Sequence, residues 1–453
     1  MGLAVFVGAL AGYQPRLALV AVFALVFVVV ALSSLTLGTC LFATLWFFSE
    51  VLPSGGLPVV KLMGILLVGS WLASVTVGAN RGRRVFESNR FLYLVLAFIL
   101  WVAMSALWAP HPGAALGAVG RYVPNAMLFP IVYAAVRRRD DALLLVGALV
   151  LGTLAAAAFG LVFPIEGEEP GRLSGALGNA NNTAASLVVA LALLGGLIGA
   201  LGDRPWLRGI VALGVPFCFF AILLTASRGG MLALAAMLLV TAVIVKRWRK
   251  AIVAGTVIAL AAGLVYFVAL APTAARERVS HPEGGTGRVD IWKVGWRMVE
   301  ANPIAGVGAG NFVTSSVDYL LRPGVIHRAD FIVDNPKVAH NTYLQLLAEL
   351  GVVGLALFLA IVASVLGFGA KAARLFARVG DGEMATLSQA ILIAIVGYLI
   401  ASFFDSREFS SDLWLLMSLA AAMPILLSRK RSMVTLIARA AIATKIRRRA
   451  SPR

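Results

Sequence analysis

The sequence predicts an all-α polytopic membrane protein, and three observations support this fold class. Of the 453 residues, 60% are hydrophobic and only 13% are charged, and the mean hydropathy is +0.92. This composition excludes a water-soluble globule. Apolar runs of about 20 residues, the length that crosses ~30 Å of hydrocarbon as a helix, recur along nearly the whole chain. The short alternating segments typical of a membrane β-barrel do not occur in the sequence.

Hydropathy and charge together predict about twelve transmembrane helices. The connections alternate between basic and neutral or acidic segments, and basic connections face the cytoplasm. This rule places both termini inside. The predicted spans are 17–35, 59–78, 90–109, 117–136, 141–163, 181–201, 207–226, 229–245, 251–270, 344–368, 385–404 and 412–428.

One stretch leaves the topology open. Residues 37–52 are apolar and end in Glu50. They form either a re-entrant segment or a further helix, and a further helix would put the N-terminus outside. We favour twelve spans.

The net charge of +18 does not indicate nucleic acid as a partner. Nucleic-acid binding needs basic residues gathered on one water-facing domain, whereas here they stand in short clusters between apolar runs, such as Arg137 to Arg139. Both cysteines, Cys40 and Cys218, lie within apolar runs. Neither a disulfide framework nor a cysteine metal site is therefore predicted.

A long connection on the outer side divides the chain. Residues 271–343 separate an N-terminal bundle, 1–270, from C-terminal transmembrane helices, 344–428, and a basic tail, 429–453, follows on the cytoplasmic side. Loops of this length usually carry function. Within it, apolar residues at helical spacing predict an amphipathic helix that lies on the membrane or on the bundle and ends before Pro303. The helix covers Arg288 to Glu300, and its apolar residues are Val289, Trp292, Trp296 and Val299.

The histidines are candidates for proton transfer, because imidazole titrates near neutral pH. All four, His111, His281, His327 and His340, fall on the outer side in this topology. His340 directly precedes a membrane helix, where Asn341 or Thr342 is a suitable N-cap. A histidine at this place is either a structural or interfacial residue or a general base.

Three arginines on the outer side are candidates for an anion site: Arg172, Arg228 and Arg288. Arg228 lies in a short turn between two apolar helices, where a cation normally has a partner. That partner is a lipid headgroup, an acid such as Asp405 or Glu408, or a phosphate held by the guanidinium.

Arg172 precedes an amide-rich helix start that includes Asn179. Such a helix N-terminus suits an anion or sugar hydroxyls, and simple helix capping explains it equally well.

No metal or cofactor is predicted. Acidic pairs with metal-ligand spacing do not occur in the outer connections. The run Gly306 to Gly310 follows no strand, which favours a turn over a nucleotide-binding loop. Glu349 lies inside a predicted helix, and three roles stay open for it: capping, pairing with an arginine, or chemistry.

Together these residues resemble the O-antigen ligase and polymerase superfamily. The resemblance rests on Arg172-Leu173-Ser174-Gly175 with Gly178-Asn179, Ser227-Arg228-Gly229, Gly287-Arg288 with Trp292, the string Pro303, Gly306, Gly308, Gly310 and Phe312, and His340-Asn341. It covers roughly residues 170–360.

The resemblance implies a glycosyltransferase C-like membrane fold and a bacterial inner-membrane enzyme that takes a glycan from undecaprenyl pyrophosphate on the periplasmic face. Acceptors differ within the superfamily. An O-antigen ligase, which uses a sugar of the lipid A core, is the favoured reading. An O-antigen polymerase and a protein O-oligosaccharyltransferase are the alternatives.

The residue types fit such chemistry. Displacing a pyrophosphate requires charge stabilisation and a base for the acceptor hydroxyl. Arg228 and Arg288, with Arg172 as a third, would hold the pyrophosphate in place of a divalent metal, with Asn179 and Asn341 as further substrate contacts. His340 would take the acceptor proton, and the reaction would invert the anomeric centre.

A secondary transporter of an anion is the alternative from a different class. A transporter would show internal repeats, broken helices and mid-membrane polar residues. The polar residues here gather instead on the outer side.

Overall fold

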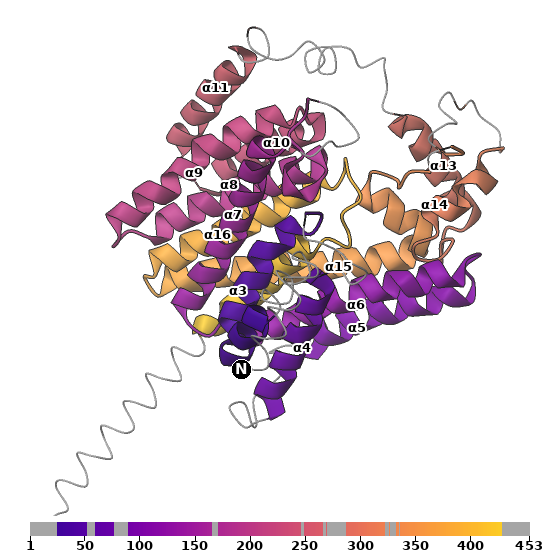
Figure 1. The fold of residues 1–453 in the computed structure, drawn as a ribbon, viewed down its shortest axis with the longest axis horizontal. Coiled ribbons are helices and arrows are strands. Elements are labelled where there is room, and N and C mark those ends of the chain that lie inside the picture. Colours follow the sequence, from indigo (N-terminus) through magenta and orange to yellow (C-terminus); the bar gives the residue numbers. More distant parts are fainter. Residues whose placement is uncertain are drawn as a thin grey trace, which may run out of the picture.

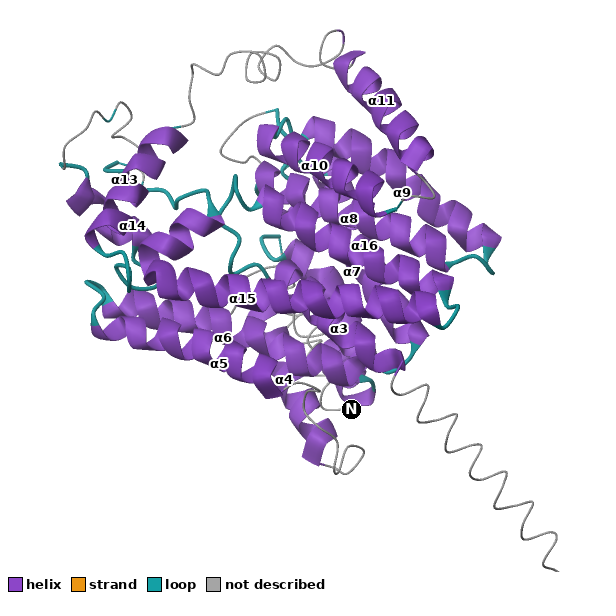
Figure 2. Ribbon diagram, turned by 180° about the vertical axis from the view of Figure 1, so that it is seen from behind, coloured by secondary structure: helices purple, strands orange, loops and turns teal. Residues whose placement is uncertain are grey.

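The computed structural model is a bundle of helices, and the residues that it describes contain no strand (Figure 2). It describes residues 25–51, 59–76, 89–164, 171–245, 249–265, 269, 287–321, 326, 332–334 and 336–427. The predicted cytoplasmic tail, the first part of the first predicted span, and His281 and His327 lie outside these ranges. Seven of the described helices are long and apolar enough to cross a membrane, so the predicted fold class of an all-α polytopic membrane protein is confirmed.

The helices follow the predicted order. The N-terminal part contains a helix at 25–33, α3 (Leu35–Leu45), η1 (Trp46–Phe48), α4 (Val59–Thr76), α5 (Asn89–Met104), η2 (Ser105–Leu107), α6 (Pro112–Ala135), α7 (Arg139–Val162), η3 (Gly175–Leu177), α8 (Ala180–Ala200), α9 (Pro205–Leu224), α10 (Arg228–Ile244) and α11 (Arg249–Val265). The C-terminal part contains α13 (Arg288–Ala301), α14 (Phe312–Ser315), η6 (Ser316–Tyr319), α15 (Thr342–Arg378), α16 (Gly382–Ala401) and a last helix, Ser411–Leu427.

Three helices form the centre of the bundle. Every residue from Ser411 to Leu427 is buried, and α8 and α16 are mostly buried as well. Small residues let α8 and α16 approach closely, because a side chain at Gly199 would meet the methyl group of Thr386. The peripheral helices α4, α5 and α9 expose most of their apolar surface, as expected for helices that face lipid.

Of the apolar stretch 37–52, residues 37–48 lie in the helices α3 and η1. Ser34 caps α3 through its hydroxyl, and α3 then runs alongside α7. The Thr36 hydroxyl bonds the carbonyl of Ala135 at one end, and Glu50 reaches Gly178 beyond the other end. Together α3 and η1 span 14 residues, about 21 Å. This length is shorter than the ~30 Å of a membrane core, so the stretch is helical, and both a re-entrant segment and a further helix stay predictions.

Several connecting segments meet at one end of the bundle, which we call the loop end. It carries the loops 171–179, 225–227 and 402–410 and the described residues of the segment 287–341. In this segment Ile291, Val294, Met298, Val307 and Phe312 form a small apolar core together with Ala348 of α15. In Figure 1, α13 and α14 lie together beside the N-terminal end of α15 and beyond the tips of α5 and α6.

The expectation of one continuous helix over 344–368 was wrong, because α15 is broken at Gly351. This glycine has φ 66° and ψ −171°. At the break, Val352 N–H donates to the carbonyl of Pro303 (2.9 Å), and Val307 N–H donates to that of Ala348 (2.9 Å). Residues 303–308 thus supply the backbone partners that the interrupted helix loses.

Replacing Gly351 by alanine is expected to lower the free energy of unfolding by ~2–4 kcal/mol. The added Cβ would require a left-handed backbone at a non-glycine residue and would collide with the backbone of Ile304. Thermal unfolding in detergent measures the change. Gly367→Ala, in the same helix with open space around it, is the matched control and should be neutral or slightly stabilising. Equal stability of the two variants would contradict this account.

Candidate active site

His340 stands at the start of α15 in an unusual backbone conformation. Its φ is 48°, in the left-handed region that non-glycine residues rarely adopt. The following residue, Asn341, caps α15 by accepting hydrogen bonds from the backbone N–H groups of Tyr343 and Leu344. The imidazole is 22% exposed, and its Nδ1 lies 3.5 Å from Oδ1 of Asp405. The structure therefore gives His340 a carboxylate partner that sequence reasoning had offered only to Arg228.

Asp405 belongs to the loop 402–410 between α16 and the last helix. Its carbonyl oxygen accepts from both the N–H (3.1 Å) and the hydroxyl (3.0 Å) of Thr342, which fixes this loop against the start of α15. Burial disfavours the charged carboxylate, but the imidazole of His340 and the charges of Arg407 and Arg288 outweigh it and lower the pKa of Asp405. Asp405 is thus an anion at neutral pH.

Arg228 is the first residue of α10, whose N-cap is the hydroxyl of Ser227. It makes no ion pair with Asp405 or Glu408, the acids proposed as its structural partners, nor with any other residue that the structure describes. The next residue, Gly229, lies directly against Phe404, since a Cβ there would be 2.7 Å from that of Phe404. The N-terminus of α10 therefore adjoins the loop that carries Asp405.

Arg172 lies beside the same turn, with its guanidinium engaged by the protein. Its Nε donates to the carbonyl of Thr225 (2.7 Å) and its Nη2 to the side chain of Asn181 (3.0 Å). The same oxygen of Asn181 accepts from the hydroxyl of Ser227 (2.8 Å). Asn179 caps α8 through its side-chain oxygen. These contacts bring Arg172 and Arg228 together, and they give Arg172 and Asn179 clear structural roles.

Arg288 opens α13, directly after Gly287 in the left-handed conformation. One turn later, the indole N–H of Trp292 donates to the carbonyl of Ala339 (2.9 Å), next to His340, and its ring contacts Phe403 edge-on at 6.2 Å. Because Arg288 also contributes to the lowered pKa of Asp405, its charge acts at the same place. The start of α13, the start of α15 and the 402–410 loop thus meet.

The extent of α13 agrees with the predicted helix over Arg288 to Glu300, and of its four predicted apolar residues Val299 is buried in the small core of the loop segment. Val289 and Trp296 are exposed, at 66% and 54%. The buried face is formed by Ile291, Val294 and Met298, because these residues fill the small core of the loop segment. Trp292 instead donates a hydrogen bond to the backbone carbonyl of Ala339, next to His340.

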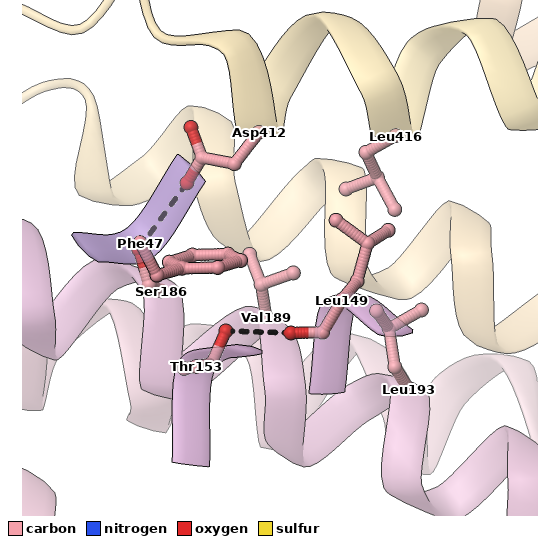
Figure 3. Close-up of a pocket in the computed structure, with 8 residues that line it drawn as sticks. All are labelled: Phe47, Leu149, Thr153, Ser186, Val189, Leu193, Asp412 and Leu416. Atoms are coloured by element: carbon pink, nitrogen blue, oxygen red, sulfur yellow. Dashed lines mark hydrogen bonds between the residues drawn. The ribbon is translucent and has the colours of Figure 1, made fainter. Parts of the chain in front are cut away.

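Arg407 is a buried charge that sequence reasoning missed. Its guanidinium bonds the carboxylate of Asp412 (3.1 Å) and the carbonyl of Asn182 (2.8 Å), and lies 4.7 Å from the centre of the Tyr398 ring. Figure 3 shows Asp412 and Ser186 beside a cavity of about 10 Å³, at the lower limit for one water molecule. Arg407 thus ties the 402–410 loop to the start of α8.

Glu349 holds the glycine-rich turn. Its carboxylate accepts from the backbone N–H groups of Gly310 (2.6 Å) and Phe312 (3.2 Å). Gly306, Gly308 and Gly310 all have positive φ, and their segment is a turn, as predicted. The turn is docked on α15, and the protein engages its N–H groups.

His111 lies apart from His340, at the start of α6, where its backbone pairs with Asn311. In the part of the chain that the structure describes, no three His, Cys, Asp or Glu side chains converge on one point.

Glu408 is a buried acid in the 402–410 loop. It is 1% exposed, and neither carboxyl oxygen has a described hydrogen-bond partner. Burial, and then the nearby charge of Glu349, raises the pKa of Glu408 to about 8. Its ordinary pKa is 4.5, so between these values the native state holds one proton more than the unfolded chain. Stability therefore falls as pH rises through this window.

Glu408→Gln is expected to remove that pH dependence. At pH 8 the variant should be more stable than the wild type by ~1–3 kcal/mol, because no buried carboxylate has to form. At pH 4.5 the two should be alike. Thermal unfolding in detergent between pH 4.5 and 9 measures both, with the exposed Glu300→Gln as control. Parallel pH curves for wild type and Glu408→Gln would contradict the assignment.

Comparison with known proteins gives one family match. Residues 210–359 match the family model of the O-antigen ligase. The matched range contains Arg228, Arg288 and His340, whereas Arg172 and the 402–410 loop lie outside it. No curated protein matches the chain.

Proposed function

With the match at residues 210–359 placing the chain in the O-antigen ligase superfamily, we propose that it is an O-antigen ligase of the bacterial inner membrane. It transfers the glycan of an undecaprenyl pyrophosphate donor to a sugar hydroxyl of the lipid A core on the periplasmic face. The observation that carries the proposal is the convergence of His340, Asp405, Arg228 and Arg288 at the loop end. An O-antigen polymerase and a protein O-oligosaccharyltransferase use the same donor chemistry and remain alternatives.

The reaction follows from these side chains. His340, with Nδ1 turned to Asp405, uses Nε2 to take the proton of the acceptor hydroxyl, and the carboxylate stabilises the resulting imidazolium. The acceptor oxygen bonds to the anomeric carbon as the bond to the pyrophosphate oxygen breaks, which inverts that centre. The electron pair leaves with undecaprenyl pyrophosphate. Arg228 and Arg288 stabilise the charge that develops there, without a metal ion.

An apolar groove supports the proposal that the donor is lipid-linked. It lies between α9, α10 and α11 and has a volume of about 510 Å³. Met231, one turn after Arg228, is among its lining residues, and the groove extends along α10 to Ala242. A pyrophosphate at Arg228 would thus have its polyprenyl chain leading directly into an apolar surface, where burial of the chain is favourable.

The test is lipopolysaccharide banding in a ligase-deleted strain that expresses this chain together with the cognate glycan and core genes. A ligase restores a ladder of core-linked glycan. Growth of lipid-linked chains without core attachment would indicate a polymerase. A third outcome is that donor accumulates and neither product forms, although the chain is present and folded in the membrane. This outcome would overturn the proposal and favour the transporter alternative.

A further inference from the structure

The backbone N–H groups of the two residues that flank His340 are both held by side chains. The N–H of Ala339 donates to Oε1 of Gln345 (3.1 Å), and the N–H of Asn341 donates to Oγ of Ser406 (3.3 Å). The two side chains also bond each other, since the Ser406 hydroxyl donates to the same oxygen of Gln345 (2.7 Å). We call Gln345 and Ser406 the backbone clamp.

We propose that the backbone clamp is a positioning device that sets the direction of the His340 imidazole toward Asp405. The inference rests on the proposed function, in which His340 is the base. Neither clamp residue reaches a substrate in this account. Each acts through the backbone of His340.

The strain at His340 explains why a clamp is needed. A histidine with φ 48° has left the backbone region that its Cβ favours. Such a conformation persists only where the surrounding structure fixes it from several sides. The clamp holds the N–H groups of Ala339 and Asn341 on either side of His340, and the indole of Trp292, in α13, holds the carbonyl of Ala339. If the clamp bonds are lost, the backbone can relax and the imidazole turns away from Asp405.

The clamp also sets both members of the His340–Asp405 pair at once. Ser406 directly follows Asp405, and its own N–H donates to Oδ1 of Asp405 (3.0 Å). Gln345 is 4% exposed, and its Nε2 donates to Oε1 of Glu349 (3.1 Å). A continuous set of hydrogen bonds therefore runs from the glycine-rich turn, through Glu349 and Gln345, to the backbone N–H of Ala339, the residue before His340. This assigns Glu349 a structural role in support of the clamp.

The test uses Gln345→Ala and Ser406→Ala in the full-length protein, with transfer from a lipid-linked donor as the activity. Each variant should lower kcat by about 10- to 100-fold, the effect of a displacement near 1 Å, with the KM for donor unchanged. The double variant should lose no more than either single one, because the two side chains form one unit. Ser406→Thr keeps the hydroxyl and should retain most of the activity. Ser388→Ala, which removes a buried hydroxyl bonded within α16, is the control and should retain full activity.

A second measurement does not depend on transfer. Diethyl pyrocarbonate modifies accessible imidazoles. Mass spectrometry measures the extent of modification at His340 relative to that at the other three histidines of the chain. The modification rate of His340 should change at least about two-fold in both alanine variants and stay constant in Ser388→Ala.

The two readouts separate the two ideas. If His340 of the wild type is modified normally but the protein transfers no glycan, the proposed function fails. The change in the modification rate of His340 in the alanine variants still tests the clamp. An unchanged rate at His340 would overturn the clamp. So would a Gln345→Ala loss of kcat that is equally large in a His340→Gln background, because the clamp acts only through His340.

Discussion

Replacing His340 by alanine is expected to lower the rate of glycan transfer by about 10²- to 10⁴-fold, the range for removing one acid-base group. The imidazole lies at the loop end with its Nδ1 turned to the carboxylate of Asp405, an arrangement that suits a general base. Donor binding should persist, because Arg228 and Arg288 are intact. Turnover and donor affinity must therefore be measured separately, on protein whose thermal unfolding matches the wild type.

His340→Gln distinguishes proton transfer from simple hydrogen bonding. Glutamine keeps hydrogen-bonding capacity but is not an effective base. If His340 is the general base, the glutamine variant should be nearly as slow as the alanine variant. Turnover close to that of the wild type in His340→Gln would reject the base assignment while leaving the site itself in place.

The local features of the site could be predicted from the sequence because they depend on neighbouring residues. Asn341 and Ser227 precede apolar helices and cap them, and capping is a short-range preference. The extent of α13 followed from its spacing and from Pro303. Arg228 stood out because an arginine between two apolar helices is unusual. These signals need no knowledge of which helices are neighbours.

The partners across the bundle could not be predicted in this way. His340 and Asp405 are 65 positions apart along the chain, and Arg407 contacts Asn182 from 225 positions away. Only the packing of α8, α15, α16 and the last helix brings them together. The break at Gly351 also has no local signal, since its missing hydrogen bonds are replaced by residues 303–308. Periodicity alone therefore predicted a continuous helix, and in α13 it did not distinguish the buried Val299 from the exposed Val289 and Trp296.

The two sides of the site differ in how firmly the protein holds its charges. The guanidinium groups of Arg172 and Arg407 are engaged by carbonyl and side-chain oxygens of the protein. Arg228 has no such partner among the described residues. The carboxylate of Asp405, in the adjoining loop, is turned to His340 instead. A guanidinium left without a protein partner, at a helix N-terminus, is available for an anion. Arg228 is thus the stronger candidate for the pyrophosphate than Arg172.

Arg228→Ala is therefore expected to lower transfer by about 10²- to 10³-fold, the cost of removing one group that stabilises a developing anion. Because Arg228 pairs with no residue that the structure describes, its removal should leave the thermal unfolding of the protein unchanged. Arg208→Ala, which removes an exposed arginine near the start of α9, is the matched control and should transfer normally.

Lysine at position 228 tests how the charge is used. A guanidinium can bond two phosphate oxygens at once, whereas an ammonium acts as a point charge. Arg228→Lys should therefore remain at least about 10-fold below the wild type in transfer, with a raised KM for the lipid-linked donor and an unchanged KM for the acceptor. Steady-state kinetics with each substrate varied in turn measure both constants. Full activity of the lysine variant would mean that position 228 supplies only a positive charge to the membrane surface, and the pyrophosphate would then have to be held by Arg288 and the N-terminus of α10 alone.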